Sequence, residues 1–189
     1  MDLSIQKVSN DNYLKVFDNN LINMNLKPTS KSNLQSNIIL NLNNENFSLD
    51  SGMKIYDNLQ ETKNSDRYQY VFPYYNFSKK PIEFKHGLVN FSSSGDSRLI
   101  NTNNLKSKII NNINYENFEI ISNFGFKNNL NAYFKNVNRI SKKDQKFKSS
   151  PQTELKSIYE INTSLPLSKI GNENIEYIIP KLSFRFNPS

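Results

Sequence analysis

Alternating apolar and polar side chains recur along most of the chain, in segments of about ten residues separated by stretches rich in Asn, Ser and Lys. Ile38, Leu40 and Leu42 occupy every second position of one such run, and the same spacing recurs in 68–74 and 175–186. Successive side chains of a β-strand point to opposite faces of a sheet. Each run therefore predicts a strand with one apolar face and one polar face.

This pattern predicts about eleven strands joined by short turns. Polar stretches at 43–46, 79–81, 92–96 and 127–129 predict turns, and 11–17 predicts one helical turn with Asp11 as its cap. Pro73, Pro166 and Pro180 each follow a strand-like run, so we expect them at strand ends. The expected strands are 3–9, 20–27, 34–43, 46–57, 66–77, 81–93, 97–104, 116–126, 129–138, 155–166 and 175–186.

Composition favours a membrane barrel over a soluble sandwich. Only 36% of the residues are apolar while 12% are aromatic, and Ala occurs once, at Ala132. No run of about 18 apolar residues exists, so membrane-spanning helices are not expected. Transmembrane β-barrels have this weak hydropathy because only alternate side chains meet lipid. We therefore expect an all-β fold: an antiparallel up-and-down transmembrane β-barrel, of which this chain supplies ten or eleven strands.

The chain is expected to form part of one barrel domain over residues 1–189. The N-terminus has no basic stretch followed by an apolar one, as an exported protein requires, and the C-terminus follows directly on a strand-like run. Both ends are therefore interpreted as truncated, and the chain as an internal fragment of a larger protein.

No catalytic, metal or cofactor site is predicted. The chain has no Cys and one His, His86, so a His- or Cys-based metal site and a His-dependent triad lack partners. Phosphate-binding glycine loops and hydrolase motifs are absent from the sequence. Aromatic and basic residues are mixed, but no compact nucleic-acid-binding motif occurs. We expect neither an enzyme nor a nucleic-acid-binding protein.

One side of each predicted strand is expected to face lipid. The polar residues that alternate with the lipid-facing ones, such as Asn41, Gln69 and Asn123, are expected to face an aqueous lumen. A shift of one residue in the strand would exchange the lipid-facing and lumen-facing sides. The lipid-facing candidates are Ile38, Leu40, Leu42, Tyr70, Phe72, Phe124, Phe126, Tyr177 and Ile179.

The longest polar stretch, 139–152, is predicted to be a loop outside the bilayer. Its cationic side chains are Arg139, Lys142, Lys143, Lys146 and Lys148. The formal net charge of the chain is +7. A basic loop or lumen attracts anionic lipid or polysaccharide. The alternative is a solvated loop, lysine-rich because the sequence favours residues with AT-rich codons.

Three segments resemble the LPS-assembly protein LptD family, also called organic solvent tolerance protein. The run 65–77 (SDRYQYVFPYYNF) resembles the family's SDRYEYxxPxxNF strand. The run 164–167 (SLPL), followed by 179–188 (IPKLSFRFNP), resembles its LPL…xxPKLSxRFxP pair. The run 8–17 is similar to its early YLxxF segment. The three segments occur in the family's order and span most of the chain.

This resemblance implies a segment of a very large barrel in the outer membrane of a Gram-negative cell. The family receives lipopolysaccharide from periplasmic LPS-bridge proteins, contains an LptE-like plug lipoprotein, and inserts lipopolysaccharide into the outer leaflet. The family's jellyroll domain and cysteines have no counterpart in this sequence. The family's lateral exit lies where the first and last barrel strands meet, and neither strand is expected in this chain, so no gate residue is transferred.

Two other functions fit parts of the pattern. A passive diffusion porin, or another exported β-barrel, has the same alternation of apolar and polar positions. A soluble carbohydrate-binding β-sandwich also alternates, but it buries its apolar positions against a second sheet.

Overall fold

The computed structural model describes residues 1–17, 30, 32–62, 67–101, 103–144, 148–170 and 175–188, apart from the side chains of Ile170 and Ile175. The predicted strand 20–27 and Lys146 lie outside these residues. In the described part, the chain is all-β with one short helix. The elements are β1 (Asp2–Ser4), α1 (Tyr13–Val16), β2 (Asn33–Asn43), β3 (Phe47–Asn58), β4 (Tyr68–Lys79), β5 (Ile82–Phe84), β6 (Gly87–Ile100), β7 (Asn104–Asn117), β8 (Ile120–Ile121), β9 (Lys127–Lys142), β10 (Gln152–Ser164), β11 (Leu167–Ile170), β12 (Ile175–Ile178) and β13 (Lys181–Phe186).

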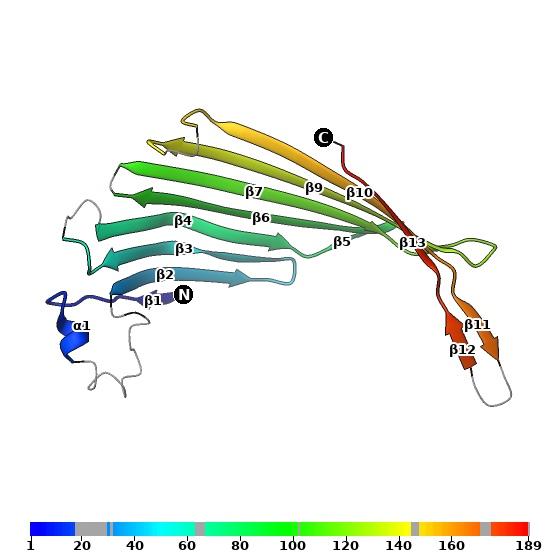
Figure 1. Ribbon diagram of the computed structural model, residues 1–189, viewed down its shortest axis with the longest axis horizontal. Helices are drawn as coiled ribbons and strands as arrows, with labels where there is room; N and C mark the ends of the chain where they lie inside the picture. Colours follow the sequence, from blue (N-terminus) through cyan, green and yellow to red (C-terminus); the bar gives the residue numbers. More distant parts are fainter. Residues whose placement is uncertain are drawn as a thin grey trace. The chain divides into compact units, whose positions relative to one another are not determined.

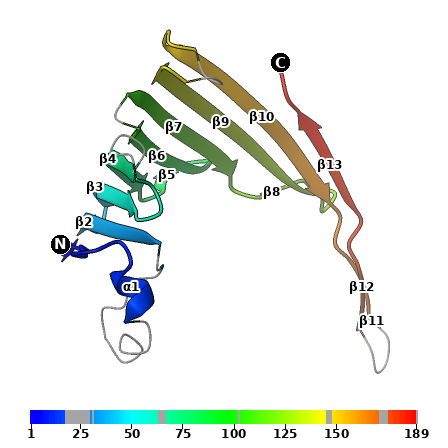
Figure 2. The same cartoon turned by 60° about the vertical axis from the view of Figure 1, so that its left-hand side comes forward.

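The strands form an antiparallel meander, in which strands that follow one another in sequence pair in space. Among the described residues, the order is β1-β2-β3-β4-β6-β7-β9-β10-β13, with β5 on β6 and β8 on β9 (Figure 1). Strands β11 and β12 form a separate hairpin that continues from β10 and β13 (Figure 2). The predicted antiparallel, all-β class is confirmed.

The chain divides into two compact units. Unit 1 comprises Met1–Ser78, Ser93–Ile110 and Val137–Thr153, and unit 2 comprises Lys79–Ser92, Asn111–Asn136 and Glu154–Ser189. Unit 1 contains α1 and β1 to β4, and unit 2 contains β5, β8, most of β10, and β11 to β13. The long strands β6, β7 and β9 contribute one part to each unit.

Two turns predicted from small polar residues are wrong. Residues 92–96 lie inside β6, where the Ser93 hydroxyl hydrogen-bonds Tyr75 Oη at 3.1 Å. Residues 127–129 begin β9, and the turn lies at 122–126, where the amide of Gly125 donates to the carbonyl of Ser122 at 2.9 Å. Cross-strand hydrogen bonds stabilise these Ser and Asn side chains within the sheet. The turns at 43–46 and 79–81 are confirmed.

The prolines behave in two ways. Pro166 follows the end of β10, and Pro180 separates β12 from β13, so both terminate strands as predicted. Pro73 lies inside β4 instead. Gln69 and Val71 line the same cavity as Tyr74, so the alternation of faces shifts by one residue around Pro73. A shift of this kind accommodates a residue that cannot donate to the ladder.

The helical turn is confirmed, but its predicted cap is wrong. Asn12 precedes α1 without a side-chain capping bond, and the Asp11 carboxylate binds Arg67. Leu14 of α1 is buried against Leu34 and Leu59, with Val8 packed beside them. This small cluster anchors α1 to the ends of β2 and β3 in unit 1.

Candidate functional site

The paired strands β2 and β3 have faces of opposite character. Residues directly opposite in the register, such as Leu42 and Leu49 or Ile38 and Met53, share a face. The apolar face carries Leu34, Ile38, Leu40, Leu42, Leu49, Met53 and Ile55, with Ser36, Ser51 and Asp57, and the polar face carries Asn33, Gln35, Asn37, Asn41, Asn43, Ser48, Asp50, Gly52, Lys54, Tyr56 and Asn58, with Ile39.

Side-chain contacts extend both faces across unit 1. On the apolar face, the Phe47 and Phe77 rings lie 5.9 Å apart, and Ser97 Oγ hydrogen-bonds Ser107 Oγ at 2.7 Å. The Ser107 side is therefore also the side of Leu105 and Ile109. On the opposite face, the Lys54 ammonium lies 4.9 Å from the Tyr74 ring centroid. Most polar and apolar positions thus lie on separate faces from β2 to β7, with exceptions such as Ile39 and Asp57.

The apolar face of unit 1 is exposed. Leu40 is 40% exposed, and Phe72 reaches 61%. A shallow groove of about 250 Å³ on this face is lined by Leu3, Ile5, Ile38, Met53 and Ile55, among others. Within unit 1, the described residues do not cover this face as a second sheet would.

Unit 2 has the same two-sided construction. Tyr159 pairs with Phe186, Ile161 with Phe184, and Thr163 with Leu182 across β10 and β13. The Phe134 and Tyr159 rings make an edge contact, with their centroids 5.7 Å apart, so Phe134 of β9 lies on the same face as Tyr159. The side chains Leu182 and Phe184 are 74% and 63% exposed.

The polar face of unit 1 contains a cationic cavity of about 490 Å³. Its charged side chains are Lys54 from β3, Asp96 and Arg98 from β6, and Lys108 from β7. Arg98 Nε donates to Asp96 Oδ2 at 2.6 Å. The neutral lining is Tyr56, Gln69, Val71, Tyr74, Tyr75, Asn76, Ser94, Gly95 and Ile110.

A second cavity of about 230 Å³ shares Asp96, Arg98 and Lys108 with the first. It adds the cations Lys106 and Arg139, together with Ser107, Ile140 and Ser141. Lys106 Nζ lies 2.6 Å from Asp144 Oδ2, whose side chain is nearly buried. Among the described residues at these two cavities, five cations from four strands therefore accompany the carboxylates of Asp96 and Asp144.

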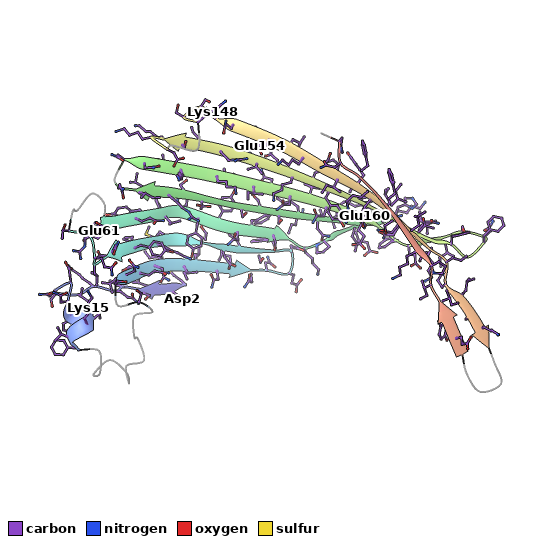
Figure 3. The ribbon with its side chains drawn as sticks, in the orientation of Figure 1. Asp2, Lys15, Glu61, Lys148, Glu154 and Glu160 are labelled. Carbon is purple, nitrogen blue, oxygen red and sulfur yellow. The ribbon has the colours of Figure 1, made fainter. Side chains whose placement is uncertain are left out.

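The polar face of unit 2 is rich in amides and hydroxyls. Its cavity of about 300 Å³ is lined by Glu119, Lys127, Asn128, Asn129, Asn162, Thr163, Ser164, Lys181, Leu182 and Ser183. Lys127 pairs with Glu119 at 2.8 Å. On the same side of β10 and β13, Glu160 (labelled in Figure 3) accepts hydrogen bonds from Asn162 Nδ2 at 2.8 Å and Arg185 Nε at 2.9 Å.

Arg67 links three segments of unit 1. It precedes β4 and donates to Asp57 at the end of β3 and to Asp11 before α1, at 2.6 and 2.9 Å. Hydrogen bonding to Asp57 and then to Asp11 raises the pKa of Arg67 above its ordinary value. Sequence reasoning missed this site because its three residues lie far apart along the chain.

The lipid-facing candidates fall into two groups. Ile38, Leu40 and Leu42 share one face of β2, opposite Asn41. Gln69 and Val71 line the polar cavity. Tyr70 and Phe72 alternate with them along β4, so they lie on the opposite face.

The other four candidates lie outside the strands of the main sheet. Phe124 and Phe126 lie in the turn before β9, as does Asn123, and Tyr177 belongs to the β11–β12 hairpin. Ile179 lies between β12 and β13. Within the predicted strand 116–126, residues 122–126 form a turn, because a short apolar run at a turn has the same composition as a strand. Within 175–186, only Ile179 and Pro180 lie outside β12 and β13.

The predicted basic loop is shorter than 139–152. Strand β9 continues to Lys142, so Arg139 and Lys142 belong to the sheet. Lys143 and Lys148 remain in the connection, with Lys148 at the strand ends in Figure 3. The Lys148 carbonyl accepts a hydrogen bond from Ser141 Oγ at 2.9 Å, which ties the connection to β9. Arg139 instead contributes to the cationic polar face.

The described ranges contain neither a metal-binding cluster nor a membrane-spanning helix. No group of three or more His, Asp or Glu side chains there is placed to hold a metal ion. None of the helical segments described is long and apolar enough to cross a bilayer.

Comparisons with known proteins do not assign a family. No family model and no curated protein matches the chain.

Proposed function

We propose that this chain is a segment of an outer-membrane β-barrel that inserts lipopolysaccharide into the outer leaflet, as the sequence resemblance to the LptD family implies. The observation that carries the barrel-wall part is the separation of apolar and polar side chains onto opposite faces within each unit. The translocated substrate, the LptE-like plug and the LPS-bridge partners rest on the resemblance alone.

The exposed apolar faces support a membrane location. Soluble monomers rarely expose contiguous apolar patches larger than a few hundred Å². In a bilayer the same side chains meet acyl chains, while the ladder satisfies the backbone N–H and C=O groups. Strands β2 and β3 contain 11 and 12 residues, and β7 contains 14. A tilted strand needs about 9–11 residues to span the hydrocarbon layer.

The polar faces support a role in moving a hydrated group past the wall. They present charged, amide and hydroxyl side chains, which replace water around a sugar or phosphate. A lipid with a polar headgroup requires both surfaces, because its acyl chains favour the apolar face and its headgroup favours the polar one.

Cysteine labelling tests the wall assignment directly. The chain lacks Cys, so Leu40→Cys and Asn41→Cys introduce single thiols on opposite faces of β2. In lipid vesicles, we expect a water-soluble maleimide to label Asn41→Cys and to spare Leu40→Cys, and a lipid-soluble quencher to affect only a fluorophore at position 40. Equal labelling of both thiols by the maleimide would contradict a wall.

Cell-based measurements separate the translocon from its rivals. Cells depleted of the protein should lose surface-exposed lipopolysaccharide, detected by antibody on intact cells. Loss of small-solute uptake with normal surface lipopolysaccharide would indicate a porin. A product that stays in solution without detergent would indicate the soluble sandwich.

A further inference from the structure

Among the described residues, the larger cavity on the polar face of unit 1 has more cations than carboxylates. Lys54, Arg98 and Lys108 line one cavity, and Asp96 is the one carboxylate among its described lining residues. These cations come from β3, β6 and β7, so the paired strands bring them together although they are distant in sequence. Like charges repel, and gathering them on one face favours a bound anion.

Two of the three cations are positioned by specific contacts. Arg98 uses Nε to bind Asp96 at 2.6 Å, and its two terminal amino groups are not part of that bond. Lys54 lies over the Tyr74 ring, a cation–π contact that orients its ammonium without using up its three donors. The cavity therefore combines a planar guanidinium with ammonium groups, the donors used to recognise phosphate.

Gly95 keeps a Tyr75 ring against this part of the sheet. A Cβ at position 95 would lie 2.6 Å from the Tyr75 ring and 3.2 Å from the Lys108 carbonyl oxygen. A Cβ only 2.6 Å from the ring would force it to move, so alanine at position 95 would displace Tyr75. Gly95 and Tyr75 lie on the side of Ser93 and Ser97, which is the apolar side of β6, so this contact lies opposite the cations.

The neutral lining suits a sugar attached to the anion. The Tyr56 and Tyr74 rings offer apolar surfaces with hydroxyl tips, and Gln69 and Asn76 offer amide donors and acceptors. A small inorganic anion would use only the cations. The second cavity extends the positive strip through Lys108 to Arg139, which leaves room for a further anionic group.

We propose that this polar face of unit 1 is a binding site for a phosphorylated sugar, with Lys54, Arg98 and Lys108 on the phosphate and the tyrosines and amides on the sugar. The site deepens the proposed function, because a phosphosugar is the hydrated part that such a wall would pass. The site itself requires only the cavity, so its binding can be tested independently of membrane insertion.

Calorimetric titration of the detergent-solubilised chain tests the site. Glucose 1-phosphate should bind, inorganic phosphate more weakly, and glucose with no measurable heat. Lys108→Gln and Lys54→Gln should each weaken binding by at least about tenfold, since each removes a charge-assisted hydrogen bond to the phosphate. Lys108→Arg should largely restore it. Lys181→Gln, in the amide-rich cavity of unit 2, is the matched control and should bind like the unchanged protein.

Two results would overturn the proposal. Equal weakening by Lys108→Gln and Lys181→Gln would mean diffuse attraction to net charge, and equal affinity for inorganic phosphate and glucose 1-phosphate would remove the sugar. Circular dichroism establishes that each variant retains its strands.

A vesicle arm identifies the source of the phosphosugar. Phosphatidylcholine vesicles containing lipid A, with phosphatidylglycerol vesicles as the anionic control, are incubated with the chain and sedimented. Retention on lipid A alone, competed by glucose 1-phosphate, supports the site with a lipid headgroup as its ligand. Binding of glucose 1-phosphate without retention supports the same site with a soluble phosphosugar.

Discussion

Units 1 and 2 have similar apolar faces and different polar faces. In both units, large apolar side chains such as Phe72 and Phe184 are exposed on the face opposite most of the polar side chains. The polar cavity of unit 1 is cationic, whereas that of unit 2 holds mainly amides and hydroxyls, with Lys127 already paired to Glu119. We therefore expect the apolar faces of both units to meet the same surroundings, and their polar faces to bind different groups.

The units also differ in how they are held together. Unit 1 has a buried leucine cluster and the Arg67 ion pairs, both of which join α1 to the sheet. The ion pair of Arg185 and Glu160 in unit 2 is exposed on its arginine side. Screening by water weakens such a surface pair. We expect unit 1 to be the more sensitive to single substitutions, and three comparisons test this expectation and the assignment of faces.

The largest effect is expected from Leu34→Ala. Leu34 is only 1% exposed, and truncation of a buried leucine leaves a cavity that costs about 3 kcal/mol. Urea titration in detergent, followed by circular dichroism, should show a clearly lower midpoint. The control Leu182→Ala removes an equal side chain that is exposed in unit 2 and should change the midpoint little. Similar losses at both positions would contradict the difference between the units.

A charge placed on the apolar face should have the next largest effect. Ile161→Lys is expected to lower the free energy of folding into lipid vesicles by about 2 kcal/mol, since a lipid-exposed lysine is costly near the bilayer centre. Asn162→Lys places the same charge on the polar face and should fold with nearly normal efficiency. The folded fraction is measured from the heat-dependent shift in gel mobility. If both variants fold equally, the apolar face of unit 2 does not meet lipid.

The smallest of the three effects is expected from Arg67→Ala. Arg67 is about one-sixth exposed and binds two carboxylates, so its loss should lower the free energy of unfolding by about 1–2 kcal/mol, after allowance for the half-exposed Asp11. Arg67→Lys keeps the positive charge but lacks the planar guanidinium that binds both carboxylates, so it should lower the free energy of unfolding less than Arg67→Ala does. Arg185→Ala in unit 2 should shift the urea midpoint less than Arg67→Ala, and the reverse order would contradict the comparison.

The sequence predicted some strands well and others poorly, for identifiable reasons. Leu40 and Asn41 fall on opposite faces of β2 as expected, since alternation is a local property of the backbone. Ser93 and Asn128 were assigned to turns, because their propensity favours turns when no cross-strand partner is known. Hydrogen bonds to Tyr75 and Thr163 keep both residues in strands, and no local pattern reveals such partners.

The sequence alone determined that the chain forms strands with one apolar and one polar face, because a period of two needs only neighbouring residues. Only the tertiary structure decided which strands lie side by side. It brought Lys54, Arg98 and Lys108 to one cavity and paired Arg67 with Asp11, because strand pairing joins residues whose separation along the chain leaves no periodic signal. The two-faced strands can thus be predicted from the sequence, whereas the cationic cavity arises from strand pairing.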